Sequence, residues 1–472
     1  MDSLEDFQIH NLFKYNISEF KARDAHLLRI AKLPFKYLSP LAQVSNFNEP
    51  GIYLVTGGRQ VGKTTFLKQY ILQLLEDKQV PAENILYLAG ELINSHHILV
   101  RLIDQFSKPD LLQYLFIDEV NYIPDWDKGI KYLADAGLLE HTVVMLTGSD
   151  SLILRTAMQR FAGRRGKVDK VDYIFYPLSF KEFVLLKKPE LRGLCELVNS
   201  IPLTEKNALY TKSHDDLKSL LNDYLIHGGY LPAIANFWQE QTIYPGTLRT
   251  YIEWIMGDML KFKKTEKHVF EVLKGILTTY SSQISWHSLL KHLSIEHHKT
   301  VSDYCLLLQD IHVIYILEAL NENTLMAAPK KNKKIYFQDP FIYHAASACV
   351  HQTLSFEHVL TTMKDPTQVS ALVEGVVISH CQRQCPTFYI KGARGEVDVA
   401  LIHGQRFLPI EVKWSTQLRD PDLSQIQSYP NGLILWNSED ISMFHQTPVI
   451  PVTRFLLVDS VCHMINTSAS SS

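Results

Sequence analysis

The stretch that decides the fold is Gly57-Gly58-Arg59-Gln60-Val61-Gly62-Lys63-Thr64-Thr65, which fits the pattern G-x-x-x-x-G-K-[ST]. Residues 52–56 predict a short buried strand before it, and residues 66–75 predict a helix with an apolar stripe after it. The motif therefore lies between a strand and a helix N-terminus, where free backbone N–H groups and the helix dipole favour an anion. We predict that all nine residues form a nucleotide-binding loop. The alternative is a glycine-rich surface turn.

Each part of this loop has a predicted role. The glycines let the backbone wrap phosphate groups without a clash from Cβ atoms. Lys63 is predicted to reach the β- and γ-phosphates, and the Thr64 hydroxyl is predicted to ligate Mg²⁺. ATP and Mg²⁺ are therefore the expected cofactors.

A second predicted strand, residues 114–117, runs directly into two acidic residues, Asp118 and Glu119. In an ATPase, Asp118 would help to hold Mg²⁺, and Glu119 would polarise the attacking water as general base. The alternative is a strand that ends in a solvated acidic turn. The phosphate-binding loop upstream favours the catalytic interpretation.

A third predicted strand, residues 142–146, is followed by Thr147-Gly148-Ser149. Ser149 is the candidate for sensing the γ-phosphate and positioning water. Arg164 is the candidate arginine for reaching a nucleotide, in its own or a neighbouring subunit. Its alternative is a surface ion pair. The alternation of apolar strands and amphipathic helices predicts an α/β fold with a parallel sheet covered on both faces.

The whole chain sets bounds on these predictions. Its 472 residues suggest two to four domains, and its net charge of −3 provides no global basic field for nucleic acid. No run of about 18 apolar residues is present and the N-terminus is acidic, so we expect a cytoplasmic protein without a membrane span. The six cysteines are scattered, and we expect reduced thiols. They are Cys195, Cys305, Cys349, Cys381, Cys385 and Cys462.

Several short segments together resemble a widespread prokaryotic group of AAA+ ATPases, which is itself similar to archaeal ATPases related to origin-recognition proteins. The resemblance rests on residues 118–126, 146–149, Ala162-Gly163-Arg164, 176–183, 228–232 and 334–339. Members of that group commonly carry a C-terminal domain of unknown function with a nuclease-like fold. The resemblance and the element pattern imply an N-terminal segment and P-loop AAA+ core over residues 1–178. A helical lid over 179–262, a winged helix over 263–345 and a PD-(D/E)xK nuclease-like α/β domain over 346–472 would follow.

Residues 266–340 predict three helices and a hairpin, which is the order of a winged helix-turn-helix. The expected helices cover residues 269–277, 286–293 and a third from about 299, and the strands cover 314–317 and 334–337. The third helix begins near His297, His298, Lys299 and Thr300, without an arginine for base reading. The predicted wing carries four lysines suited to phosphates. These are Lys330, Lys331, Lys333 and Lys334. The alternative is an interaction or oligomerisation module with a solvated basic loop.

The C-terminal region contains Asp398 followed by Glu411-x-Lys413, the pattern of a PD-(D/E)xK nuclease core. On a strand, residues i and i+2 share a face, so Glu411 and Lys413 are expected to point the same way, beside Asp398 on the neighbouring strand. Asp398 and Glu411 would hold Mg²⁺, Lys413 would help to generate or orient hydroxide, and Glu374 would complete the site from a helix. The alternative is a hairpin with charged cross-strand pairs.

These features predict an ATP-binding and ATP-hydrolysing protein that acts on nucleic acid, DNA more than RNA, with a metal-dependent nuclease-like domain. An arginine supplied between subunits would favour a homo-oligomer. The alternative is a nucleotide-dependent switch or protein-remodelling ATPase whose nuclease-like domain only binds nucleic acid or a partner.

Overall fold

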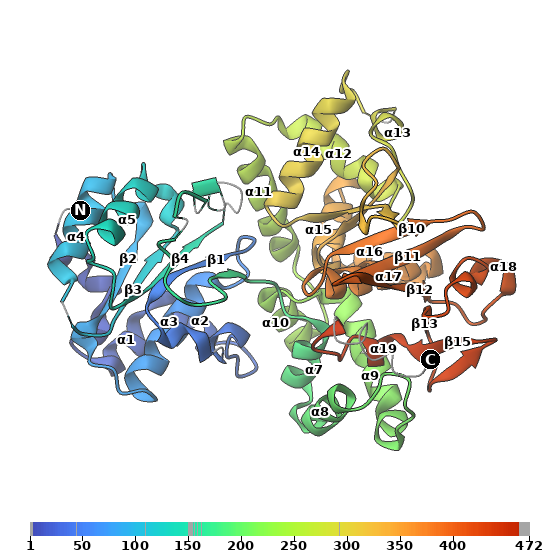
Figure 1. Cartoon of the computed structure of the whole chain (residues 1–472), viewed down its shortest axis with the longest axis horizontal. Helices are drawn as coiled ribbons and strands as arrows, with labels where there is room; N and C mark the ends of the chain where they lie inside the picture. The colour runs from blue at the N-terminus through green and yellow to red at the C-terminus, as the bar shows by residue number, and fades with distance from the viewer. Residues whose placement is uncertain are drawn as a thin grey trace. The chain divides into compact units, whose positions relative to one another are not determined.

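The structure is a computed structural model that describes residues 3–43, 45–108, 110–149, 154, 156–157, 159–161, 163–291 and 293–461. Ala162 and Cys462, named above, lie outside these ranges. The chain divides into two compact units, Met1–Tyr176 and Pro177–Ser472, and each is described by itself (Figure 1). Among the described helices, none combines the length and the hydrophobicity that a membrane crossing requires.

The first unit is built on a five-stranded sheet in the order β2-β3-β4-β1-β5. Every neighbouring pair in this sheet is parallel. The predicted parallel α/β sheet is therefore confirmed. Its strands are β1 (Gly51–Thr56), β2 (Ile85–Ala89), β3 (Gln113–Asp118), β4 (Thr142–Gly148) and β5 (Asp172–Ile174).

Helices cover both faces of this sheet, because successive strand residues point to opposite sides. Leu115 and Ile117 pack into one apolar cluster with helices α4 and α5. Phe116 points to the other side, where its ring contacts Tyr70 of α3. Figure 1 shows α4 and α5 across the sheet from α3. The helices are α1 (Ile17–Arg23), α2 (Ala25–Ala31), α3 (Lys63–Glu76), α4 (His96–Phe106) and α5 (Trp126–Asp135).

The second unit begins with helices over the range predicted as a helical lid. They are α7 (Phe180–Lys187), α8 (Arg192–Ser200), α9 (Ala208–His227), α10 (Leu231–Glu240) and α11 (Pro245–Lys261). Three further helices and an antiparallel strand pair follow in the order expected for a winged helix. They are α12 (Glu266–Thr278), α13 (Trp286–Leu290), α14 (His298–Asp310), β6 (Ile314–Glu318) and β9 (Lys333–Phe337). A small pair, β7 (Leu320–Asn321) and β8 (Met326–Ala327), lies between β6 and β9 in the chain.

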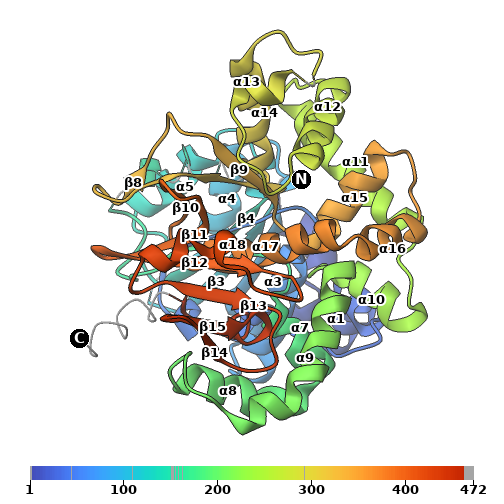
Figure 2. The ribbon, with the colours of Figure 1, turned by 90° about the vertical axis from the view of Figure 1, so that its right-hand side faces the viewer.

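A six-stranded mixed sheet in the order β10-β11-β12-β13-β15-β14 forms the C-terminal part of this unit (Figure 2). A parallel bridge between Ala319 and Tyr389 connects the end of the β6 segment with β10. The strands are β10 (Thr387–Lys391), β11 (Glu396–His403), β12 (Arg406–Lys413), β13 (Leu433–Trp436), β14 (Ser442–Phe444) and β15 (Thr447–Pro451). The helices are α15 (Pro340–Val350), α16 (Phe356–Lys364), α17 (Pro366–Gln382), α18 (Asp420–Leu423) and α19 (Val452–Phe455).

The cysteines differ in part from expectation. Cys195, Cys305, Cys349 and Cys381 are free thiols. Cys385 is disulfide-bonded, so the prediction of reduced thiols throughout is wrong for this residue. Spacing along the sequence gave no sign of the pairing.

Candidate nucleotide and metal sites

The Gly57–Thr65 loop has the backbone shape that a phosphate cradle requires. Gly57 has φ of 152° and Gly62 has φ of 110°, both in the region that favours glycine. A Cβ atom on Gly57 would lie 2.3 Å from the carbonyl oxygen of Phe175, so no other residue fits there without a shift. Helix α3 begins directly at Lys63, and its first N–H groups therefore face the loop.

The Lys63 ammonium is held over this loop. Its Nζ donates to the carbonyl oxygens of Gly57 at 3.0 Å and of Gly58 at 2.9 Å. The side chain is 5% exposed. A cation so placed, together with the N–H groups of the helix N-terminus, makes the loop suitable for an anionic phosphate.

The parallel register brings the carboxyl ends of three strands together. Thr56 at the end of β1 pairs with Gly148 at the end of β4, and Ile117 of β3 pairs with Leu146 of β4. The phosphate-binding loop, Asp118 and Ser149 therefore meet at one edge of the sheet. This is where ligands bind in open α/β sheets.

Asp118 is the centre of a hydrogen-bond network at this edge. Its Oδ2 accepts from the hydroxyls of Thr64 at 2.7 Å and Tyr87 at 2.8 Å, and its Oδ1 accepts from the hydroxyl of Thr147. The link from Thr64 to Asp118 joins the two residues predicted to hold Mg²⁺. Their hydroxyl and carboxylate oxygens are ligands that Mg²⁺ prefers.

Glu119 is fixed beside this network in an uncommon backbone conformation, with φ of 51° and ψ of 50°. Its N–H donates to the Thr147 hydroxyl at 3.0 Å. Its Oε2 accepts from the backbone N–H of Ser149 at 3.2 Å and from the Ser149 hydroxyl at 3.1 Å. The predicted base and the predicted sensor residue are therefore in direct contact. Left-handed backbone at a non-glycine residue is concentrated at functional sites.

Tyr87 and Thr147 belong to this network, although neither was predicted as a site residue. Tyr87 lies inside an apolar strand and looks like an ordinary core residue. Lys68 on α3 lies over its ring, with Nζ 3.3 Å from the ring centroid and 3.5 Å from Asp24 Oδ2. Burial lowers the pKa of Lys68 to about 8. A polar residue at the end of an apolar strand was the signal available for Thr147.

The structure does not bring Arg164 to the phosphate-binding loop. Its Nε pairs with Asp135, the last residue of α5, and the nearby Gly166 pairs with Gly51 at the start of β1. Both partners belong to the opposite edge of the sheet, because β1 and α5 run in opposite directions. Arg160 instead pairs with Asp127 at 2.5 Å, in the first turn of α5, toward the carboxyl edge. A contact of Arg164 with a nucleotide in a neighbouring subunit stays a prediction.

In the second unit, α17, β11 and β12 bring the four predicted residues of the nuclease-like site together. Val399 pairs with Ile410 in the β11–β12 ladder, so Asp398 lies beside Glu411. Asp398 Oδ2 accepts the N–H of Val412 at 3.0 Å. Lys413 Nζ lies 2.6 Å from Glu411 Oε1.

Lys334 lies among the same carboxylates, although the sequence pattern placed it on an exposed basic wing. Its side chain is fully buried, with Nζ 2.7 Å from Glu374 Oε1 and 3.2 Å from both Glu396 Oε1 and Asp398 Oδ1. The Tyr336 hydroxyl also donates to Glu374 Oε1, at 2.5 Å. The expectation that Lys334 contacts phosphates from the wing is wrong, because the carboxylates of α17 and β11 enclose it. Lys330 and Lys331 are exposed, as expected.

Burial and mutual repulsion perturb the acids of this cluster. Burial, with the neighbouring Asp398, raises the pKa of Glu374 to about 7 and holds the pKa of Glu411 well above its usual value. Burial also acts to raise the pKa of Asp398, but the ammonium groups of Lys334 and Lys413 outweigh it and lower that pKa. For Lys334, burial acts to lower the pKa, and the carboxylates, Glu374 first, raise it well above normal.

The donor set of the cluster fits a divalent cation in part. Glu411 is 3% exposed, and its Oε2 has no hydrogen-bond partner within the described part of the chain. A buried carboxylate oxygen without a partner calls for a cation or a proton. Within the described ranges, however, no three His, Cys, Asp or Glu side chains are already arranged to hold a metal ion. Lys334 lies at the point toward which three of the carboxylates converge.

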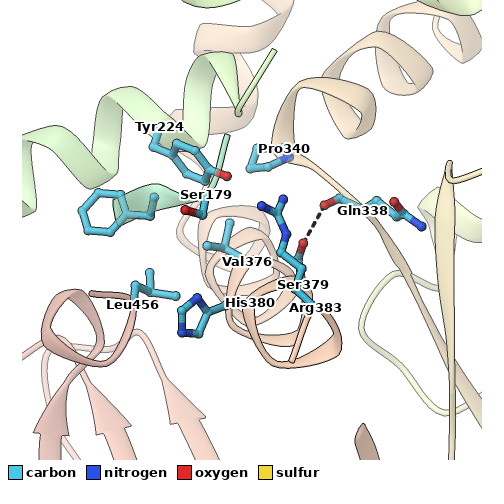
Figure 3. A pocket seen from close by; sticks show the side chains of 10 residues that line it. Ser179, Tyr224, Gln338, Pro340, Val376, Ser379, His380, Arg383 and Leu456 are labelled. Carbon is cyan, nitrogen blue, oxygen red and sulfur yellow. Dashed lines mark hydrogen bonds between the residues drawn. The ribbon is translucent and has the colours of Figure 1, made fainter. Parts of the chain in front are cut away.

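A separate small cavity lies among α7, α9 and α17 (Figure 3). Its volume is about 10 Å³, which is close to the minimum for one water molecule. The Ser379 hydroxyl on its wall donates to the carbonyl oxygen of Gln338 at 2.8 Å. Burial, with Arg383 and Lys181 nearby, lowers the pKa of His380 to about 3. The cavity is too small for a ligand, so we assign it to packing.

Comparison with known families places the first site in a class. Residues 49–184 match the family described as "AAA domain", and residues 218–353 match a domain of unknown function, DUF8612. Together with the parallel sheet and the phosphate-binding loop, the first match gives the N-terminal unit a P-loop AAA fold of α/β class.

The individual relatives are distant. The chain is 24% identical over 284 residues to the uncharacterized protein MJ1544 of Methanocaldococcus jannaschii, and the match spans 58% of each chain. The Walker-type ATPase PABY2304 of Pyrococcus abyssi is 14% identical, with a TM-score of 0.40, over 64% of this chain and 91% of that one. The Aeropyrum pernix ORC1 protein, solved in complex with DNA, is 14% identical, with a TM-score of 0.28, over 69% and 92%.

Proposed function

We propose that the protein is an ATPase that binds ATP with Mg²⁺ at the Gly57–Thr65 loop and acts on DNA. The observation that carries the ATPase activity is the contact from Thr64 to Asp118 beside Glu119 and Ser149. Thr64 and Asp118 would hold Mg²⁺, which would offset the negative charge of the phosphates when bound. Lys63 would bind the phosphates. Glu119, held by Ser149, would accept a proton from the attacking water.

ATP turnover by the purified protein, with and without DNA, tests this proposal. Lys63→Ala should abolish ATP binding, with Lys21→Ala, an exposed lysine that pairs with Glu76, as its matched control. Glu119→Gln should bind ATP but lose turnover by at least about a hundredfold, the usual contribution of a general base. Normal turnover in Glu119→Gln would refute its assignment.

For contact with DNA, we propose the surface formed by the start of α14 and the loop before β9. The order of three helices and an antiparallel strand pair is that of a winged helix, in which the third helix enters the major groove. Lys299, Lys330 and Lys331 are exposed there. Lys330→Ala with Lys331→Ala should weaken DNA binding and reduce its salt dependence. Lys206→Ala with Lys212→Ala removes equal charge from α9 and the loop before it, and should leave binding unchanged.

A second activity, Mg²⁺-dependent cleavage of DNA, is favoured by one specific observation. Asp398, Glu411 and Lys413 lie together on β11 and β12, with Glu374 opposite on α17. Asp398 and Glu411 would hold the metal, and Lys413 would orient the attacking water. Asp398→Ala should abolish cleavage and leave ATP binding intact, with the exposed Asp420→Ala as control. Cleavage that persists in Asp398→Ala would exclude this site.

The alternative, a switch or remodelling ATPase whose C-terminal domain only binds a partner, predicts a different result. ATP turnover would be indifferent to DNA, and the DNA would stay intact in the same assay.

A further inference from the structure

The position of Lys334 calls for an explanation that the proposed activities do not give. It lies on β9, between the exposed Lys331 and the buried Tyr336, and none of its side chain is exposed. Burying an ammonium group is costly unless it is paired and hydrogen-bonded. Here three carboxylates, from Glu374, Glu396 and Asp398, surround it at 2.7 to 3.2 Å. The lysine is therefore a built part of the acidic cluster.

The carboxylate oxygens nearest to Lys334 are already engaged. Asp398 uses Oδ1 for Lys334 and Oδ2 for the N–H of Val412. Glu374 uses Oε1 for both Lys334 and the Tyr336 hydroxyl. Among the acids of the described chain, only Glu411 has a fully buried oxygen without a hydrogen-bond partner. Within the described chain the cluster thus presents one fully buried oxygen without a partner, while the ammonium group occupies the common point of the other three acids.

We propose that Lys334 is an internal counter-cation that competes with a divalent cation for Asp398 and Glu374. This inference rests on the proposed metal site of the nuclease-like domain and adds its regulation. The structure describes the arrangement in which the lysine holds the carboxylates. When a metal ion binds at Asp398, the ammonium group either moves away or stays close to a second positive charge.

The competition follows from the distances. A divalent cation bound to Asp398 Oδ1 at about 2.1 to 2.6 Å lies no more than about 6 Å from Nζ, because Nζ is itself 3.2 Å from that oxygen. Repulsion between a unit charge and a dication at such a distance is strong in a partly buried site. Removing the lysine charge should therefore tighten metal binding, as long as the carboxylates keep their positions.

The test measures Mn²⁺ binding to the nucleotide-free full chain by calorimetry, so it does not depend on cleavage. We expect Lys334→Met to bind Mn²⁺ at least about tenfold more tightly than the unmodified protein, because one nearby positive charge is lost. Lys333→Met is the matched control: Lys333 is the preceding residue on β9, pairs with Glu318 and lies outside the cluster. Its Mn²⁺ affinity should equal that of the unmodified protein.

A second variant is needed if Lys334→Met does not fold. The double change Lys334→Met with Glu374→Gln removes one opposite-charge pair and keeps the net charge of the cluster. It should bind Mn²⁺ more tightly than the single change Glu374→Gln, because the two variants differ only in the lysine charge and both keep Asp398 and Glu411. Affinity that is equal or weaker in a folded variant would overturn the competition and make Lys334 a positioning residue.

Asp398→Ala separates failure of this inference from failure of the proposed site. If the unmodified protein binds Mn²⁺, Asp398→Ala loses it and Lys334→Met gains nothing, only the competition is refuted. If no protein in the series binds Mn²⁺, the metal site itself is refuted, and the inference with it.

Discussion

Single side chains at the carboxyl edge of the first sheet depend on partners that are far away in sequence. Tyr87 is the clearest case, because its hydroxyl donates to Asp118 Oδ2 at 2.8 Å from 31 residues upstream. Asp118 Oδ2 also accepts from Thr64. Tyr87 therefore helps to fix the carboxylate that the proposed Mg²⁺ site requires.

At this scale we predict that Tyr87→Phe weakens the ATPase site. The change removes one buried hydrogen bond to a carboxylate, so the free energy of unfolding should fall by roughly 1.5 to 3 kcal/mol. The Mg²⁺ concentration needed for half-maximal ATP turnover should rise. Urea unfolding and a Mg²⁺ titration measure the two effects. Tyr114→Phe, a hydroxyl deletion on β3, is the control, and an unchanged Mg²⁺ requirement in Tyr87→Phe would contradict the role.

At the scale of elements, one aspartate joins two helices of the second unit. Asp339 caps α15 by accepting the N–H of Phe341 at 2.8 Å, and it also accepts the N–H of Gly229 at 2.8 Å, after α9. Gly228 has φ of 59°, and a Cβ atom there would lie 1.8 Å from Asp339 Oδ1. The turn after α9 and the start of α15 are therefore fitted to one another.

Asp339→Ala should cost more than the loss of an ordinary helix cap, which is about 0.5 to 2 kcal/mol. Asp365→Ala supplies the comparison, because Asp365 caps α17 but is only half-buried. Chemical unfolding of both variants measures the difference. Equal losses would mean that the bond to Gly229 contributes nothing.

Secondary structure and the first site were largely predictable, because their signals are local. The apolar run before Gly57 predicted β1, and the acids after residue 117 marked the end of β3. The burial of Lys334 among carboxylates was not predictable, because its carboxylate partners lie 40 to 64 residues downstream. A run of lysines next to a loop normally stays solvated. Lys334 is buried only because β9 packs against α17 and β11. The place of Arg164 within its own subunit was not predictable for a related reason, because the sequence did not reveal at which edge of the sheet its segment would lie.

At the scale of the whole molecule, buried histidines of the second unit couple its stability to pH. Burial lowers the pKa of His227 to about 4, of His344 to about 4 and of His380 to about 3, from 6.5. Between those values and 6.5 the unfolded chain binds more protons than the folded one, so stability is lost as pH falls below 6.5. Asp339, Glu374 and Glu411 act in the opposite direction, since burial raises the pKa of Asp339 to about 6, that of Glu374 to about 7 and that of Glu411 well above its usual value.

We therefore predict that each of these histidines by itself lowers the free energy of unfolding as pH falls from 6.5 to 5, at up to about 1.4 kcal/mol per pH unit, against the opposite contribution of the three acids. Urea unfolding followed by tryptophan fluorescence reports it, because the tryptophans at 238, 254, 286, 414 and 436 belong to this unit. His227→Gln should remove the share of one histidine, so the variant should lose less stability, or gain more, than the unmodified protein between pH 6.5 and pH 5. An identical pH dependence in the two proteins would contradict the prediction.

The bridge from Ala319 to Tyr389 and the buried pairs of Lys334 also have an evolutionary consequence. The predicted domain boundary at residue 346 falls between the lysine and its acids. A recombination event at that boundary would give one descendant an unpaired buried ammonium group and the other an unpaired set of carboxylates. We therefore expect the β6–β9 strand pair and the six-stranded sheet to be inherited together.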